Sequence, residues 1–222
     1  RYMYNVAKKR GIPGSEFNPA AGVKQYLVQG RERFLTPEEI QRLRVAVEKS
    51  INKQLKYIVA LLLMLGCRKS ELLNAKWEHM DLDRRTWKIP LSKSGKMRHV
   101  PLSSAAVDLL KEVPRWKGCP YVLPNPKTLK PLVDFHEPWA TACRRAGLKD
   151  VRIHDLRHTF ASNLVNAGHS LFVVSRALGH ASVVQTARYS HLADDTLLAA
   201  ADAAANAMGN TWSDLKKTSV PA

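Results

Sequence analysis

The residues best suited to chemistry lie between His154 and Tyr189. A His-Asp-Leu-Arg-His run begins at His154 and includes Arg157, a Leu-Gly-His run ends at His180, and Tyr189 comes nine residues later. This set supplies cations, proton carriers and a nucleophile. A phosphodiester gathers negative charge on its non-bridging oxygens during substitution, and arginine's planar fork suits that geometry better than lysine. The spacing therefore predicts phosphodiester chemistry, with Tyr189 able to attack the phosphorus directly.

The first two of these residues belong to one predicted helix. Leu156, Phe160 and Leu164 recur at i, i+4 and i+8 and mark its buried face. His154 and Arg157 are one turn apart, so they can converge on one phosphate at a helix N-terminus, which itself favours anions. Taken alone, the pair is better explained as a solvated face with a capping histidine, so the hypothesis depends on the other residues.

An arginine far upstream joins this set. The segment Leu55–Leu65 is apolar nearly all round and is followed by Gly66, which is typical of a central core helix with a glycine C-cap. Arg68 therefore lies just after the end of a central helix, at a rigid part of the domain. Glu71 follows three residues later. Instead of a role in the site, Arg68 and Glu71 could simply form a surface i,i+3 ion pair.

A β-hairpin is predicted from two short extended runs, 86–90 and 97–102, joined by a polar turn that contains Gly95. Lys93 lies at or near the tip of this hairpin. A third strand is expected over Tyr121–Leu123.

The remaining elements are helices. Thr36, followed by Pro37 and Glu39, predicts a helix start with a capping box, and Leu35 is positioned to pack on Ile40. Further helices are expected over 103–113, 133–146, 155–167, 170–178 and 183–190. The sequence therefore predicts an α+β domain that is mainly α, with a small antiparallel β-sheet.

The order of Arg68, the hairpin lysine, His-x-x-Arg, Leu-Gly-His and tyrosine resembles the tyrosine recombinase (phage integrase) family. The resemblance runs from about Arg33 to His191. Each motif alone is weak, but five separated motifs in one order make a specific match. The resemblance implies the catalytic-domain fold of that family, in agreement with the mainly helical prediction above.

The resemblance implies a role for each polar residue. Tyr189 would attack the scissile phosphate, His154 would assist the transfer of its proton, and Lys93 would protonate the departing 5′-oxygen as a general acid. Lys96 is an alternative for the last role, because motif positions in hairpins slip easily, and Lys96 and Arg98 are otherwise expected to contact the DNA backbone.

The charge-stabilising group follows from the same resemblance. Arg68, Arg157 and His180 would stabilise the transition state, and Glu71 would help to hold the site. A 3′-phosphotyrosyl bond retains the energy of the phosphodiester, so the expected strand breakage and rejoining needs neither a metal nor a nucleotide cofactor.

The resemblance also implies domains and partners. Residues 1–30, with an Asn-Pro-Ala-x-Gly-Val run, are expected to be the end of a core-binding domain plus a linker, residues 31–193 the catalytic domain, and residues 194–222 a C-terminal helix or tail that docks in trans. The expected partners are double-stranded DNA, further protomers in a tetramer on DNA, and accessory proteins that bend DNA or set direction.

Composition supports a polyanionic partner. The chain has 35 Lys+Arg and 19 Asp+Glu, a formal charge of +16, which favours nucleic acid over a membrane surface. Its longest apolar run, Ile58–Leu65, is far shorter than the ~20 residues that span a bilayer. Three cysteines without C-x-x-C spacing indicate neither a disulfide framework nor a zinc knuckle, so a reducing, cytoplasmic setting fits.

Three alternatives stay open. A type IB topoisomerase uses similar chemistry but reseals the same strand. The helices between Asp155 and Ser190 fit a non-catalytic helix-turn-helix DNA binder, which would have no need of Tyr189. A metal-dependent hydrolase could use histidines 154, 158, 180 and 191, although Arg157 between the first two would repel a dication.

Overall fold

The computed structural model describes residues 2–19, 21–24, 26, 33–90, 97–180 and 182–207, without the side chains of 183, 191–199 and 207. The chain divides into two compact units, Arg1–Arg31 and Glu32–Ala222. The described part of the first unit holds one helix, α1 (Tyr2–Lys9), with no buried residue. Its side chains Tyr2 and Met3 are largely exposed.

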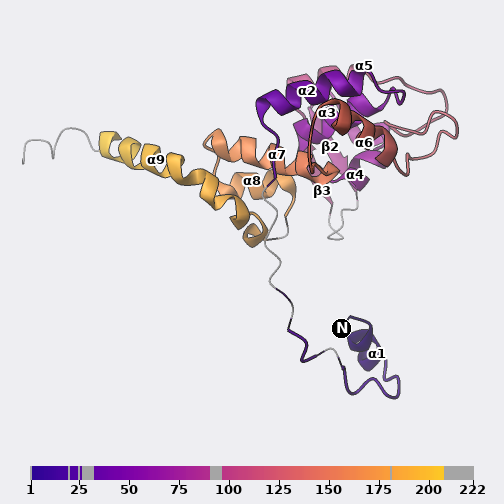
Figure 1. The fold of residues 1–222 in the computed structure, drawn as a ribbon, viewed down its shortest axis with the longest axis vertical. Helices are drawn as coiled ribbons and strands as arrows, with labels where there is room; N and C mark the ends of the chain where they lie inside the picture. Colours follow the sequence, from indigo (N-terminus) through magenta and orange to yellow (C-terminus); the bar gives the residue numbers. More distant parts are fainter. Residues whose placement is uncertain are drawn as a thin grey trace, which may run out of the picture. The chain divides into compact units, whose positions relative to one another are not determined.

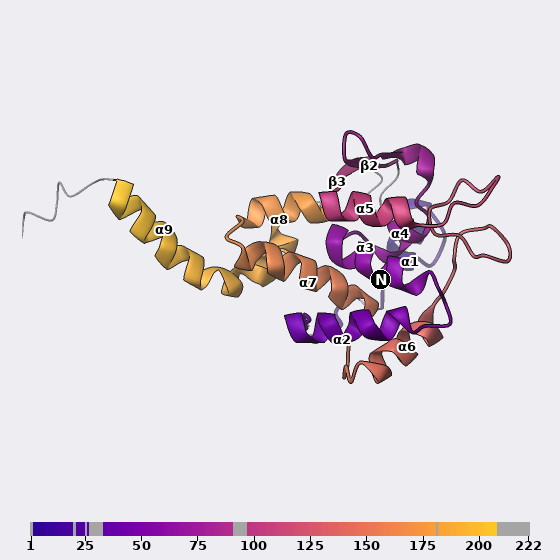
Figure 2. The ribbon, with the colours of Figure 1, turned by 90° about the horizontal axis from the view of Figure 1, so that it is seen from above.

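The second unit is mainly helical with a small sheet (Figures 1 and 2). Its helices are α2 (Pro37–Glu48), α3 (Leu55–Leu65), α4 (Lys69–Leu73), α5 (Ser104–Glu112), α6 (His136–Arg145), α7 (Ile153–Asn166), α8 (Leu171–Leu178) and α9 (Asp194–Ala207), with 3-10 turns η1 (Trp77–His79), η2 (Val183–Gln185) and η3 (Ala187–Ala193). Its strands are β1 (Met80–Asp81), β2 (Thr86–Ile89) and β3 (Arg98–Pro101), in the order β1-β2-β3 and antiparallel. The predicted fold class is therefore confirmed.

Helix α3 is the centre of the core. It packs against α2, α4, α5 and α7, and it buries Leu55, Tyr57, Ile58, Val59, Leu61, Leu62 and Leu65. The helix ends at Gly66, whose φ of 55° is left-handed, as a glycine C-cap requires. A Cβ at Gly66 would also overlap the ring of Phe160 on α7. The predicted central helix and its glycine stop are confirmed.

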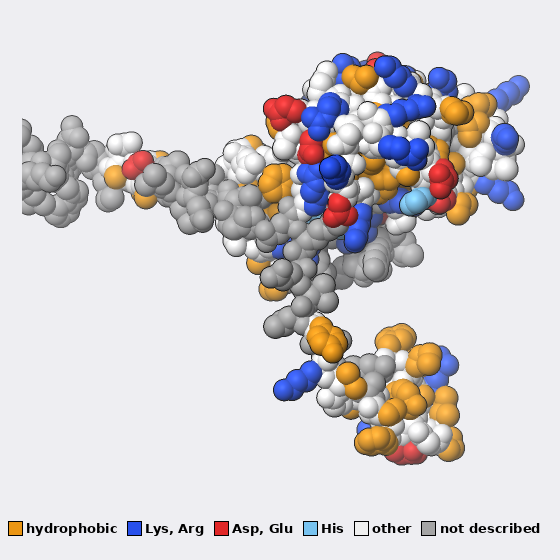
Figure 3. Space-filling model, viewed as in Figure 1, with side chains coloured by type: hydrophobic (Ala, Val, Ile, Leu, Met, Phe, Trp, Pro, Cys, Tyr) orange, Lys and Arg blue, Asp and Glu red, His pale blue; other side chains and the backbone are white. Residues whose placement is uncertain are grey.

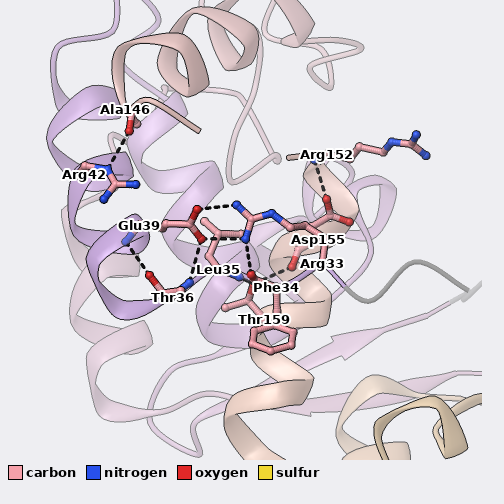
Figure 4. Close-up of polar contacts among 10 residues, drawn as sticks. All are labelled: Arg33, Phe34, Leu35, Thr36, Glu39, Arg42, Ala146, Arg152, Asp155 and Thr159. Atoms are coloured by element: carbon pink, nitrogen blue, oxygen red, sulfur yellow. Dashed lines mark hydrogen bonds and ion pairs between the residues drawn. The ribbon is translucent and has the colours of Figure 1, made fainter. Parts of the chain in front are cut away.

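The start of α2 is joined to α7 by a buried hydrogen bond (Figure 4). The Glu39 amide donates to the Thr36 hydroxyl, and the Glu39 carboxylate accepts from the Thr36 amide at 3.1 Å, which completes the predicted capping box. One residue earlier, the Leu35 amide donates to the Thr159 hydroxyl at 2.9 Å. This contact spans 124 residues of sequence and holds α2 against the helix that carries His154 and Arg157.

The sheet confirms the predicted hairpin but not the third strand. Strand β2 pairs with β3 in the register Trp87 to Val100. The expected strand at Tyr121–Leu123 is wrong, because Tyr121 makes only an isolated bridge to Lys76. Prolines on both sides of that run lack the amide hydrogen that a ladder needs. The third strand is the two-residue β1.

Three of the predicted helices differ from the structure by two or more residues, and the first of them, α7, begins at Ile153 rather than 155. Helix α6 begins at His136 rather than 133, since Asp134 accepts hydrogen bonds from the two amides that follow it. The run expected as a helix over 183–190 is instead the 3-10 segments η2 and η3, separated at the fully buried Thr186. Within the described residues, no helix is long and apolar enough to cross a membrane.

Candidate active site

A buried glutamate gathers two of the arginines. The Glu71 carboxylate accepts from Arg68 Nη1 at 2.8 Å and from Arg98 Nη2 at 2.7 Å, and also from the Arg68 backbone amide at 2.9 Å. Burial alone would raise the pKa of Glu71, but its hydrogen bonds with Arg98 and Arg68 hold that pKa below its usual value. The carboxylate therefore stays ionised and holds Arg68 at the start of α4.

Arg157 is held by backbone rather than by an acid. Its Nη1 donates to the Gly66 carbonyl at 2.7 Å and its Nη2 to the Leu178 carbonyl at 2.9 Å. The side chain is 4% exposed. Since a guanidinium has five N–H donors, both bonds are compatible with further bonds to a phosphate. Arg157 thus joins the ends of α3 and α8 at the site.

Positive charge exceeds negative charge around these arginines. Burial first, and then the charges of Arg68 and Arg98, lower the pKa of Arg157 to about 10. Burial followed by the charges of Arg157 and Arg68 lowers the pKa of His180 to about 4. The Glu71 carboxylate opposes three guanidinium groups, so the cluster favours the binding of an anion.

His180 is oriented by a turn and a hydroxyl. Helix α8 ends at Gly179, with φ 66°, and the His180 amide bonds back to the Ser175 carbonyl. The ring Nδ1 lies 2.8 Å from the Thr186 hydroxyl. With one ring nitrogen occupied in this way, the other is available to a ligand.

The tyrosine is buried, and its hydroxyl has a partner. Tyr189 is 6% exposed and packs in a small apolar cluster with Ala161, Val165, Val174 and Leu178. Its hydroxyl lies 2.5 Å from Nδ1 of His158. Burial raises the pKa of Tyr189, although the charges of Arg188 and Arg157 act in the opposite direction. The phenol is therefore neutral at pH 7.

The sequence assigns His158 no role except as one of the four histidines of the metal-hydrolase alternative. Its ring stands edge-on to His154, with centroids 4.9 Å apart, one helical turn away. Burial, then His154 and Arg188, lower the pKa of His158 to about 4, so it is a neutral hydrogen-bond partner for Tyr189. The tyrosine partner lies 31 positions away, so spacing gives no signal for this contact.

The other predicted site residues have different positions. Burial of His154, and then the charge of the nearby Arg157, lower the pKa of His154. Lys93 and Lys96 lie outside the described residues. Arg98, expected to contact the DNA backbone, has a side chain that is 11% exposed and binds Glu71 and the Ala177 carbonyl. Arg98 therefore helps to hold the Glu71 carboxylate, which in turn binds Arg68.

No three His, Cys, Asp or Glu side chains gather as a metal site would need, within the part of the chain that the structure describes. His154 and His158 adjoin Arg157 and Tyr189 instead. The side chain of His191, the fourth histidine of the metal-hydrolase alternative, lies outside the described part of the chain.

Comparison with known proteins agrees with this geometry. Residues 33–196 match the phage integrase family. The chain belongs to the phage integrase family. It is 34% identical over 180 residues to the integrase of Salmonella phage P22, covering 75% of this chain and 46% of that protein. It is 33% identical over 192 residues to a shufflon-specific DNA recombinase of Escherichia coli, covering 84% and 47%.

Solved structures of an integrase and of a site-specific recombinase share the fold. The catalytic domain of bacteriophage HP1 integrase aligns with a TM-score of 0.61 at 29% identity, covering 76% of this chain and 93% of that domain. The XerH recombinase bound to a palindromic difH substrate aligns with a TM-score of 0.64 at 26% identity, covering 81% and 55%. The chain spans about half the length of the two curated relatives named above, and it corresponds to the catalytic domain of the family.

Proposed function

We propose that this chain is the catalytic part of a site-specific recombinase that cleaves and rejoins DNA through a 3′-phosphotyrosyl intermediate. The observation that carries the proposal is the excess of buried positive charge around Glu71, which lowers the pKa of Arg157 to about 10 through burial and then through Arg68 and Arg98. A bound phosphodiester would offset that repulsion. It would also present a phosphorus to the nearby Tyr189.

In the cleavage step, Tyr189 Oη forms a bond to phosphorus as the bond to the 5′-oxygen breaks. The phenolic proton passes to a base, for which His154 is the candidate, and Lys93 gives a proton to the 5′-oxygen. Arg68, Arg157 and His180 stabilise the charge on the non-bridging oxygens. In the reverse step, the 5′-hydroxyl of a second strand attacks the phosphorus and displaces Tyr189. A phosphodiester thus replaces the phosphotyrosyl ester without a metal or ATP.

Double-stranded DNA is the proposed partner. The formal charge of +16 favours a polyanion, and Figure 3 shows many Lys and Arg side chains on one face of the second unit, with a few acidic ones between them. Further protomers in a tetramer on DNA, and accessory proteins that bend DNA or set direction, are proposed partners. Residues 200–206 of α9 are exposed, which is compatible with docking of the tail in trans.

A suicide substrate tests the proposal. The chain is incubated at low salt with a pool of duplexes that carry random cores and a nick, so that cleavage releases a short strand and traps the covalent product. We expect an adduct that survives denaturant, forms equally with EDTA and is absent for Tyr189→Phe. A helix-turn-helix binder would give no adduct, and a metal-dependent hydrolase would lose cleavage in EDTA; either result refutes the proposal.

The topoisomerase alternative needs a different readout. Cores recovered from the adducts are placed in two separate duplexes and in one supercoiled plasmid. We expect strand transfer between the duplexes. Relaxation of the plasmid without any transfer would favour a type IB topoisomerase instead.

The proposed role of Lys93 has its own test. A substrate with sulfur in place of the 5′-bridging oxygen has a leaving group that needs no proton. Lys93→Ala should cleave the ordinary substrate slowly and the sulfur substrate at nearly the wild-type rate. Lys96→Ala is the matched control, and rescue of that variant alone would assign the general acid to Lys96.

A further inference from the structure

We propose that His158 positions the nucleophile, with its Nδ1 accepting a hydrogen bond from the Tyr189 hydroxyl and directing that oxygen relative to Arg157. The two atoms lie 2.5 Å apart. His158 is adjacent to Arg157 in the sequence and both lie on α7. The same rigid helix therefore holds the cation that would bind the phosphate and the acceptor that holds the attacking group.

The surroundings of the tyrosine make this hydrogen bond important. Its ring packs among apolar side chains, and its backbone amide donates to the Thr186 carbonyl within a short 3-10 segment. Apolar packing restrains the ring but does not direct a hydroxyl. A buried hydroxyl also needs a partner to offset its desolvation. The His158 ring supplies that partner from α7, and η3 packs directly on α7.

Neutral His158 fits an orienting role better than that of final proton acceptor. Burial, then His154 and Arg188, lower its pKa to about 4, while Asp155 acts in the opposite direction. A neutral imidazole with a proton on Nε2 accepts through Nδ1, which is the nitrogen that faces the tyrosine. His158 thus holds the phenol in place, and net removal of the proton falls to another base.

The hydrogen bond itself can be tested without DNA. Nitrogen-15 NMR of histidine side chains would be compared between the wild-type chain and Tyr189→Phe, with His158→Asn used to assign the signal. We expect the Nδ1 resonance of His158 to have the shift of a hydrogen-bonded acceptor and to move when the hydroxyl is removed. If that resonance is the same in both proteins, or belongs to a protonated nitrogen, the proposal is overturned.

A second experiment tests the positioning role in cleavage. Asparagine places its amide near the Nδ1 position of histidine, whereas glutamine reaches the Nε2 position. At saturating suicide substrate, His158→Asn should form the adduct within about 10-fold of wild type, and His158→Gln should be about 10²-fold slower, the scale of a misplaced reacting group. DNA affinity and Tm should be similar in the two variants, and equal adduct rates for them would show that His158 only packs.

The proposal rests on Tyr189 being the nucleophile of the proposed function, and the two experiments separate the possible failures. If the wild-type chain forms no adduct, the proposed function fails while the NMR comparison still decides whether the hydrogen bond exists. If the wild-type chain forms the adduct and the two His158 variants match it, the function stands and the positioning role is refuted.

Discussion

At the scale of single residues, Arg157 serves the fold and the candidate site at once. Its guanidinium donates to the Gly66 and Leu178 carbonyls, which are 91 and 21 positions away. These bonds compensate a side chain that would otherwise be costly to bury. Because removal of Arg157 would leave both carbonyls without this donor, its loss would change stability as well as cleavage. Arg68 is the clearer probe of chemistry, since its side chain is 23% exposed.

Replacing Arg68 should affect the reaction more than the fold. Arg68→Ala should slow adduct formation by roughly 10²-fold or more, because a donor to the transition-state charge is lost. Arg84→Ala is the matched control, since Arg84 is 87% exposed and pairs only loosely with Asp81. Single-turnover cleavage at saturating DNA is the measurement. Equal rates for the two variants would remove Arg68 from the site.

The sequence predicts the residue types of the site better than their contacts. Arg68 and Glu71 are recognisable by spacing, and the structure pairs them directly. Arg98 is expected to contact the DNA backbone, and in the structure its guanidinium binds the same carboxylate. The sequence names His158 only as one of four histidines of a metal-site alternative, yet in the structure it lies beside the Tyr189 hydroxyl. Both contacts depend on long-range packing that no local pattern encodes.

At the scale of elements, two glycine turns place backbone and side chains at the site. The Gly66 turn ends α3 and offers its carbonyl to Arg157. The Gly179 turn ends α8, and a Cβ there would come within 2.6 Å of Arg98 Cδ. Gly179 is therefore required by its left-handed φ and by the approach of Arg98. The same turn presents His180.

A pair of alanine substitutions separates the effect of the left-handed φ from the effect of the close approach of Arg98. Gly168 also has a positive φ, 83°, but open space around its Cα. Gly168→Ala should lower the free energy of unfolding by about 1 kcal/mol from backbone strain alone. Gly179→Ala should lower it further and slow cleavage, because Arg98 must move away from Glu71. Urea unfolding and adduct assays measure both effects, and identical stabilities would contradict the importance of the Arg98 contact.

Elements with strong local signals follow from the sequence, and those set by tertiary contacts do not. The capping box at Thr36 is local, as is the glycine stop of α3, and the structure contains both. Strand β1 has two residues, too few for any alternation to be seen. The run after His180 has the length of a helix, but Thr186 is buried and bonded to that histidine, which interrupts it.

At the scale of the whole molecule, one buried and one half-buried histidine, both neutral, link stability to pH. The pKa values of His158 and His180 are both lowered to about 4, in each case mainly by burial, against an unfolded value of about 6.5. Between these values the unfolded chain binds more protons than the folded protein, so stability rises with pH across that window. The stability is complete above about pH 6.5 and is lost as the pH falls toward 4.

We therefore expect a Tm that is nearly constant from pH 7 to 8 and decreases from pH 6.5 to 4. Acidic groups with lowered pKa, such as Glu71, contribute in the same direction. His180→Asn and His158→Asn isolate the histidine contribution, because each should flatten the dependence. Scanning calorimetry gives the measurement, and variants with the full wild-type slope would show that the folded protein does not hold these histidines in the neutral form.

The proposed function requires the phenol of Tyr189 to attack a DNA phosphate. Identification of the amino acid that becomes linked to DNA tests this claim most directly. The adduct from the suicide substrate is digested with nuclease and protease, and the modified peptide is sequenced by mass spectrometry. We predict a single modified residue, Tyr189, joined to a 3′-phosphate, with a free 5′-hydroxyl on the released strand. Linkage through another residue, or a 5′-phosphate on the released strand, would contradict the assignment.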